Sequence, residues 1–169
     1  MKITLEKLSQ ADARTLYEFE LENRDYFEKM VPSRGQDYYD WKTFKIRHKA
    51  LLDEQNDGQS YYYLIKNEKL VIIGRINVVD IDLSDNLGYI GYRVGEAYTG
   101  KGIATKALKL LIGTIEKQNI QQILAKTTTN NLASQRILEK SGFKHISTSD
   151  EVFEMNGNYL KFTYFKWTI

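Results

Sequence analysis

A glycine-containing segment, residues 98–105, joins an apolar strand-like run at 87–94 to an amphipathic helix pattern that begins at residue 103. Gly100, Lys101 and Gly102 stand where that helix starts. The free N–H groups of a first helical turn, together with the helix dipole, attract anions such as phosphate. Glycine lets the backbone approach such an anion because it has no Cβ atom. The segment therefore predicts a phosphate cradle, with a plain connecting turn as the alternative.

Two common phosphate-binding motifs do not fit this segment. The chain has no Gly-x-x-x-x-Gly-Lys-Ser/Thr string, which a P-loop requires. Gly100-x-Gly102 begins the dinucleotide pattern Gly-x-Gly-x-x-Gly, but Thr105 stands at its third glycine position. Gln121 and Gln122 occupy the region where an acidic residue would bind the ribose. The spacing therefore argues against the two usual nucleotide sites.

Composition and charge exclude several classes of protein. The chain has 169 residues, of which 42% are apolar and 27% charged, and we expect one globular domain over residues 1–169. The net charge of +2 indicates neither a nucleic-acid nor a membrane partner. The absence of cysteine excludes disulfides and thiolate zinc sites, and His48 and His145 lie far apart without metal-ligand spacing. We therefore expect no metal site. Since the first residues contain no long apolar run, we expect a cytoplasmic protein.

Hydrophobic periodicity predicts a single sheet covered by helices. The segments with helical spacing are residues 13–21, 38–52, a stretch from 103 onward, and 133–138. The strand patterns occupy residues 3–5, 61–65, 70–79, 87–94 and 123–128. Residues 143–169 alternate like a final hairpin, in which Asn156-Gly157 fits a type I′ turn. Because helices cross between strands, we expect an α/β or α+β fold.

Two ordered motifs resemble the GNAT superfamily of acetyl-CoA-dependent N-acetyltransferases. The family's loop, Gln/Arg-x-x-Gly-x-Gly/Ala, is matched by residues 99–104 except at its first position, where Thr99 stands. A second signature, an asparagine followed by a short helix ending in Lys-x-Gly-Phe, is matched from Asn131 to Phe143. Residues 22–27 resemble the RimJ/RimL-type branch, which acetylates protein N-termini, including those of ribosomal proteins. The resemblance implies one mixed, mostly antiparallel sheet of about six to seven strands flanked by about four helices.

The resemblance also implies where acetyl-CoA would bind. The backbone of residues 99–105 would hold the pyrophosphate, with Lys101 at the rim. The pantetheine arm would lie in a cleft between the strands at 87–94 and 123–128, with the thioester oxygen near Val94 and a hydrogen bond from Asn131. The residues expected to contact the donor are Val94, Thr99, Gly100, Lys101, Gly102, Ile103, Ala104, Thr105 and Asn131. A helix-capping role is the alternative for Asn131.

The resemblance implies a proton donor for the departing thiolate as well. Many family members carry a tyrosine seven residues after the asparagine, but Leu138 stands there in this chain. Ser134, three residues after Asn131, matches a serine that RimJ/RimL-type enzymes are proposed to use as the acid. The base is expected at Glu151 or Glu154, on a strand facing the substrate. Three further residues, Glu22, Tyr89 and Tyr92, are expected near the substrate cleft, with surface exposure or core packing as the alternative.

The sequence leaves the acceptor open. An α-amine with a pKa of about 7.8 costs only about 1 kcal/mol to deprotonate at pH 7, whereas a lysine amine costs almost 5 kcal/mol. The leading hypothesis is therefore acetylation of a protein or peptide N-terminus. The alternatives are a small amine such as a polyamine or aminoglycoside, a non-catalytic acyl-CoA-binding module, and a nucleotide-binding α/β protein. The sequence does not settle the oligomeric state, and a homodimer is one option.

Overall fold

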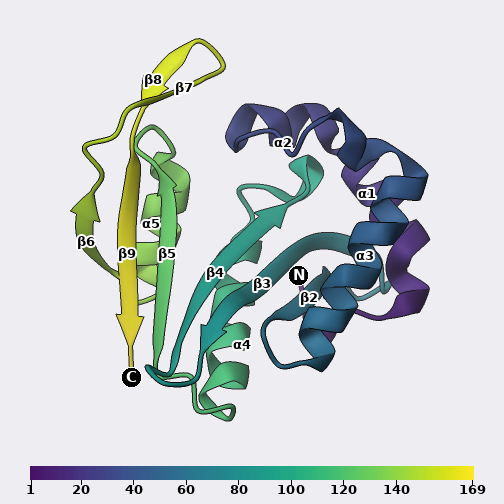
Figure 1. Ribbon diagram of the computed structural model, residues 1–169, viewed down its shortest axis with the longest axis horizontal. Coiled ribbons are helices and arrows are strands. Elements are labelled where there is room, and N and C mark those ends of the chain that lie inside the picture. The colour runs from purple at the N-terminus through teal and green to yellow at the C-terminus, as the bar shows by residue number, and fades with distance from the viewer.

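A seven-stranded sheet forms the centre of the molecule in a computed structural model that describes residues 1–169 (Figure 1). Its spatial order is β1-β2-β3-β4-β5-β9-β6. The strands are β1 (Thr4–Lys7), β2 (Tyr61–Lys66), β3 (Ile72–Asp82), β4 (Leu87–Val94), β5 (Gln122–Thr128), β6 (Lys144–Thr148) and β9 (Phe162–Thr168). Only the β4–β5 pair is parallel. The predicted mixed, mostly antiparallel sheet is therefore confirmed.

Helices cover both faces of this sheet. On one face lie α1 (Ala13–Glu22), α2 (Arg24–Met30) and α3 (Trp41–Asn56), and on the other lie α4 (Ile103–Glu116) and α5 (Leu132–Lys140) (Figure 1). The helix predicted over 38–52 begins later, because Asp40 caps α3 by accepting a hydrogen bond from the Thr43 N–H at 3.0 Å. No helix in the structure is both long enough and apolar enough to cross a bilayer.

Five α-helices form rather than about four, because Asn23 separates α1 from α2. Its backbone angles (φ −101°, ψ 9°) leave the helical region. The Asn23 amide donates to the Phe19 carbonyl at 2.9 Å, and its Oδ1 accepts from the Glu96 N–H at 2.9 Å. One buried side chain thus ties the α1–α2 corner to the segment that follows β4.

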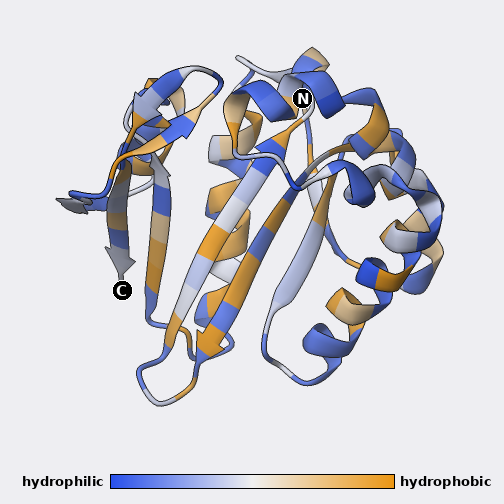
Figure 2. Cartoon of the chain, turned by 45° about the horizontal axis from the view of Figure 1, so that its top comes forward, coloured by the Kyte–Doolittle hydropathy of each residue, from blue (hydrophilic) through white to orange (hydrophobic).

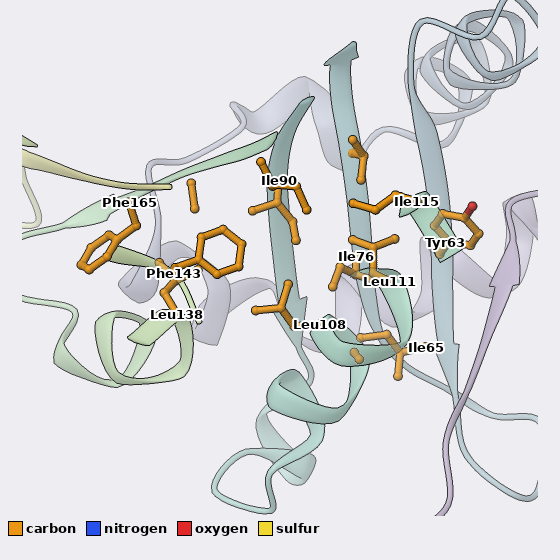
Figure 3. Close-up of a cluster of buried hydrophobic side chains, with 14 of the residues drawn as sticks. Tyr63, Ile65, Ile76, Ile90, Leu108, Leu111, Ile115, Leu138, Phe143 and Phe165 are labelled. Atoms are coloured by element: carbon orange, nitrogen blue, oxygen red, sulfur yellow. The ribbon is translucent and has the colours of Figure 1, made fainter. Parts of the chain in front are cut away.

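Two apolar cores sandwich the sheet. The larger core packs α4 and α5 against one face and includes Ile76, Ile90, Leu108, Leu111 and Phe165, all buried (Figure 3). The smaller core packs α1, α2 and α3 against the other face and includes Leu16, Phe19, Phe27, Phe44 and Leu64. The hydropathy colouring shows apolar and polar residues mixed along the central strands (Figure 2).

The C-terminal region differs from the predicted single hairpin. β6 pairs with β9, while β7 (Phe153–Met155) and β8 (Asn158–Leu160) form a separate two-stranded sheet. The turn between β7 and β8 is Asn156-Gly157, and both residues have positive φ (53° and 81°), as a type I′ turn requires. The Asn156 amide donates to the Glu28 carbonyl at 3.0 Å, so the tip of this hairpin touches α2.

β4 and β5 separate after four paired positions. Their parallel register runs from Leu87–Gln122 to Ile90–Ala125 and then stops. The last residues of β4, from Gly91 to Val94, continue to pair with β3 but have no partner on the β5 side. The central sheet is therefore open between the carboxyl ends of its two parallel strands (Figure 1).

Candidate functional site

A cleft of about 720 Å³ occupies the opening between β4 and β5. It is lined by both diverging strands, by the loop before α4, by the start of α5 and by α2. Side chains that alternate along β4 reach it from opposite faces of the sheet. Tyr92 packs with the α4–α5 core. Arg93 lies opposite Arg75 in the β3–β4 register, on the face covered by α1, α2 and α3. The cleft therefore passes through the sheet and has two chemically distinct sides.

The predicted phosphate cradle forms one side of this cleft. Gly100 and Gly102 have φ of +73° and +74°, a left-handed conformation that favours glycine. A Cβ atom added to either glycine would meet no protein atom within 4 Å. The backbone N–H groups from Gly100 to Thr105 donate to no protein acceptor. A turn of unpaired donors at the start of α4, with room in front of it, fits a pyrophosphate.

Thr99 lines the cleft but already uses its donors within the protein, and Lys101 lies outside the cleft. The Thr99 N–H donates to the Glu96 carbonyl at 3.3 Å, and its hydroxyl donates to the same oxygen at 2.9 Å. The run of free donors therefore begins at Gly100, because a short 3-10 turn, η3 (Glu96–Tyr98), uses the Thr99 donors. Lys101 is exposed, does not line the cleft, and lies with Nζ 5.7 Å from the centre of the Tyr98 ring.

Val94 and Asn131, both predicted to contact the donor, line the cleft. Val94 is the last residue of β4. The Asn131 Oδ1 caps α5 by accepting from the Ser134 N–H at 3.1 Å, so the capping role is confirmed. The Asn131 Nδ2 group donates to no protein acceptor, and the residue lines the cleft. One side chain can thus cap the helix and still donate to a ligand.

Ser134 contacts a half-buried tyrosine, Tyr92. Its Oγ lies 3.1 Å from the Tyr92 hydroxyl, and both residues line the cleft. Burial raises the pKa of Tyr92, and the hydrogen bond with Ser134 offsets only part of that rise. Tyr92 therefore stays protonated at neutral pH and can pass a proton through Ser134. The sequence places both residues near the substrate, but their separation of 42 positions gave no sign of this contact.

The carboxylates expected near the substrate lie elsewhere. Glu151 was predicted on a strand, but it belongs to an exposed loop before β7, where its N–H donates to the Ser149 Oγ. Glu154, on β7, is exposed, and so is Glu22, at the end of α1. Neither these three glutamates nor Tyr89 lines the cleft. The prediction that Glu151 lies on a strand is therefore wrong, and the structure places this residue outside the cleft.

A buried ion cluster forms the other side of the cleft. Glu20 is fully buried and accepts from Arg75 at 2.7 Å and from Arg93 at 3.1 Å. The Tyr38 hydroxyl accepts from Arg75 at 3.0 Å and from Arg34 at 2.9 Å. Burial acts to raise the pKa of Glu20, but the arginines outweigh it and lower that pKa. Glu20 is therefore ionised, and it holds two guanidinium groups at the cleft wall.

Two charged residues at apolar positions of the sequence could have indicated this ion cluster. Glu20 falls on the same face of α1 as Leu16 and Phe19, which are buried, so a carboxylate occupies an apolar stripe. Arg75 likewise interrupts an apolar strand. A buried charge requires a partner, and the two residues together indicated an ion pair.

The charged side chains that line the cleft are all cationic. They are Arg34, Arg75, Arg93, Lys126, Arg136 and Lys140. No aspartate or glutamate lines the cleft, since Glu20 stands behind the arginines. The site therefore attracts anions and lowers the pKa of an amine that enters it.

The sequence matches a known family model and two curated relatives. A family model described as "Acetyltransferase (GNAT) domain" matches residues 2–144. The chain is 28% identical over 161 residues to "Probable N-acetyltransferase YjcK" of Bacillus subtilis (strain 168), covering 92% of this chain and 87% of the relative. It is 23% identical over 161 residues to "[Ribosomal protein uS5]-alanine N-acetyltransferase" of Escherichia coli (strain K12), covering 94% of this chain and 83% of that protein.

A solved structure shares the whole fold. It is that of RimL, described as a ribosomal L7/L12 alpha-N-protein acetyltransferase in complex with coenzyme A. The two chains superpose with a TM-score of 0.90 at 18% identity, covering 100% of this chain and 95% of the other. At this low identity the similarity concerns the fold.

Proposed function

The chain belongs to the GNAT acetyltransferase family, and on that basis we propose that it transfers the acetyl group of acetyl-CoA to the α-amine of a protein or peptide N-terminus. The observation that carries the choice of amine is the cationic lining of the cleft, which contains no carboxylate. Relatives named for acetylation of ribosomal proteins support the same choice.

The donor side of the cleft fits acetyl-CoA. The unpaired N–H groups from Gly100 to Thr105 would bind the pyrophosphate, and Arg136 and Lys140 on α5 add positive charge to the cleft. Val94 ends the unpaired edge of β4, and Asn131 offers an amide donor across from it. When bound, acetyl-CoA supplies the activated acetyl group as a thioester.

The acceptor side favours an amine that deprotonates easily. At pH 7 an α-amine with a pKa near 7.8 pays about 1 kcal/mol to lose its proton, and a lysine or polyamine nitrogen near 10.4 pays almost 5 kcal/mol. A cationic cleft lowers both pKa values and repels polycations, but it provides no carboxylate base to remove a lysine proton. An α-amine needs no such base, so Glu151, exposed outside the cleft, has no role in this proposal.

Acetylation assays with matched amines test the proposal. The purified chain is given acetyl-CoA together with an Ala- or Ser-starting peptide, the same peptide blocked at its N-terminus but bearing a lysine, or spermidine. We expect thiol release only with the free N-terminus, and mass spectrometry should place the acetyl group on the α-amine. Turnover confined to spermidine or lysine would refute the α-amine assignment, and tight CoA binding without any turnover would favour a non-catalytic module.

Removal of either hydroxyl of the Ser134–Tyr92 pair should slow the reaction. Because each variant, Ser134→Ala or Tyr92→Phe, leaves one proton donor in place, we expect kcat to fall about tenfold, less than the loss of a complete general acid. The Kd for CoA should change by less than about twofold, since neither hydroxyl belongs to the cradle. Single-turnover rates and CoA titrations measure the two effects separately.

The double variant distinguishes a shared proton path from two independent contacts. If either hydroxyl can supply the proton when the other is missing, Ser134→Ala combined with Tyr92→Phe should lower kcat by more than the product of the two single losses, whereas two independent contacts should give that product. Ser141→Ala is the matched control, because the Ser141 hydroxyl bonds only the Ile137 carbonyl of its own helix. Unchanged kcat in both single variants would remove the pair from the mechanism.

A further inference from the structure

Positive charge exceeds negative charge on the acceptor side of the cleft. Arg34, Arg75 and Arg93 all line it, and Glu20 is the one carboxylate that pairs with any of them. Glu20 bonds Arg75 and Arg93, whereas Arg34 bonds only the neutral Tyr38 hydroxyl. One carboxylate thus faces three guanidinium groups.

The arginines also keep unused donors. Arg75 and Arg93 each bond the protein only through Nη1, so Nε and Nη2 of both residues donate to no protein acceptor. Their side chains are only 4% and 12% exposed, so these donors lie at the cleft surface with little contact to bulk water. Arg34 is exposed and places a third guanidinium at the mouth. Guanidinium groups recognise carboxylates and phosphates through pairs of such donors.

Burial makes this excess charge costly without a ligand. Arginine does not neutralise itself by losing a proton, so a buried surplus of guanidinium groups needs an anion. Burial and repulsion from Arg34 lower the pKa of Arg93, which reflects the same crowding. A second cavity of about 430 Å³ behind the cluster is lined by Arg34, Arg47 and Arg75 and contains no carboxylate. The surroundings therefore supply no second carboxylate, and the other favourable contacts are with aromatic rings: Arg93 lies 4.6 Å from the centre of the Phe27 ring and Arg34 lies 5.0 Å from that of Tyr38.

The cluster lies on the opposite side of the sheet from the phosphate cradle. Arg75 and Arg93 face each other across β3 and β4, on the face covered by α1, α2 and α3. The cradle and Tyr92 lie on the face covered by α4 and α5. The phosphates of a donor held at the start of α4 would therefore be separated from these arginines by the sheet. An anion at the arginines belongs to the acceptor.

We propose that the acceptor is an N-terminus with an acidic side chain among its first residues, whose carboxylate binds Arg34, Arg75 and Arg93. This inference rests on the proposed acetylation of protein N-termini and assigns its sequence preference. Asn77 lies on the same face as Arg75, and its buried Oδ1 has no protein partner. That oxygen can accept a backbone N–H from an extended peptide whose carboxylate pairs with the arginines.

A peptide series tests the preference. Peptides that start with Ala or Ser carry Asp, Asn or Lys at position 2, 3 or 4 in an otherwise constant sequence. We expect kcat/KM for the best Asp peptide to exceed that of its Asn counterpart about tenfold, and this ratio to shrink as salt is raised. Arg34→Gln should bring the ratio close to one. Arg34 is exposed, so this variant is expected to fold.

A matched variant and a second class of amine complete the test. Arg14→Gln removes an exposed arginine that pairs with Glu18 and does not line the cleft, so the acidic preference should persist.

Acetylation of all N-terminal peptides at equal rates would overturn the acidic preference while leaving the proposed function intact. If no peptide reacts, phosphoethanolamine is compared with ethanolamine. A phosphate-dependent rate would keep the anion site and refute the peptide acceptor, and equal rates would refute both.

Discussion

Gly102→Asp should abolish CoA binding, with a rise in Kd of at least about a hundredfold, or about 2.7 kcal/mol. The new carboxylate would project into the open space in front of the cradle, where no protein atom lies within 4 Å. It would oppose a bound phosphate and attract the free N–H groups at the start of α4. Calorimetric titration with CoA measures the loss.

Two control variants separate charge from backbone strain. Gly102→Asn has the same size without the charge and tolerates a left-handed φ, so CoA binding should weaken far less. Gly58→Asp introduces the same residue at the same φ of +74°, with no neighbour within 4 Å, in a turn that does not line the cleft. It should leave CoA affinity unchanged. If Gly102→Asp binds CoA as the original chain does, the cradle lies elsewhere.

Glu20→Gln should destabilise the fold by about 3–5 kcal/mol, the usual cost of removing one partner from a buried ion pair. The substitution preserves shape but leaves Arg75 and Arg93 without their shared carboxylate in a buried setting. Urea unfolding gives the change in free energy. Glu18→Gln, which removes an exposed carboxylate two residues away, should cost less than about 1 kcal/mol.

The same carboxylate should shape the acid sensitivity of the protein. The pKa of Glu20 in the folded chain lies below its ordinary value of 4.5. Its contribution to the free energy of unfolding is therefore complete above about pH 4.5 and is lost as the pH falls below that value toward the folded pKa. Glu20→Gln should flatten the decline of stability in this acid range. An unchanged slope would show that Glu20 is not ionised in the folded chain.

Local chemistry explains what the sequence predicts well. The glycine loop, the Asn156-Gly157 turn and the strand at 87–94 each depend on neighbouring residues, and all three lie where they were expected. The strand predicted from Leu70 begins two residues later, because Leu70 adopts a φ of +62° in the turn. Short-range rules thus place elements well and their ends less exactly.

The acceptor side depends on contacts that local patterns do not encode. Glu20 meets Arg75 and Arg93 across 55 and 73 positions. The loop holding Glu151 leaves the sheet because β7 and β8 pair with each other instead of extending β6 and β9. The alternation of apolar residues fits both the predicted single hairpin over residues 143–169 and the observed separate β7–β8 pair. Only the three-dimensional pairing of strands decides which carboxylates reach the cleft.

The gap between β4 and β5 also makes the stability of this protein depend on what fills it. On the side facing β5, the segment from Gly91 to Val94 has no neighbouring strand, so the amides that point to that side should exchange quickly with deuterium in the free protein. A donor bound along that edge should slow this exchange and raise the melting temperature through mass action, by about 2.7 kcal/mol at a hundred times its Kd. Supply of the acetyl donor would then govern how long the enzyme survives as well as how fast it works.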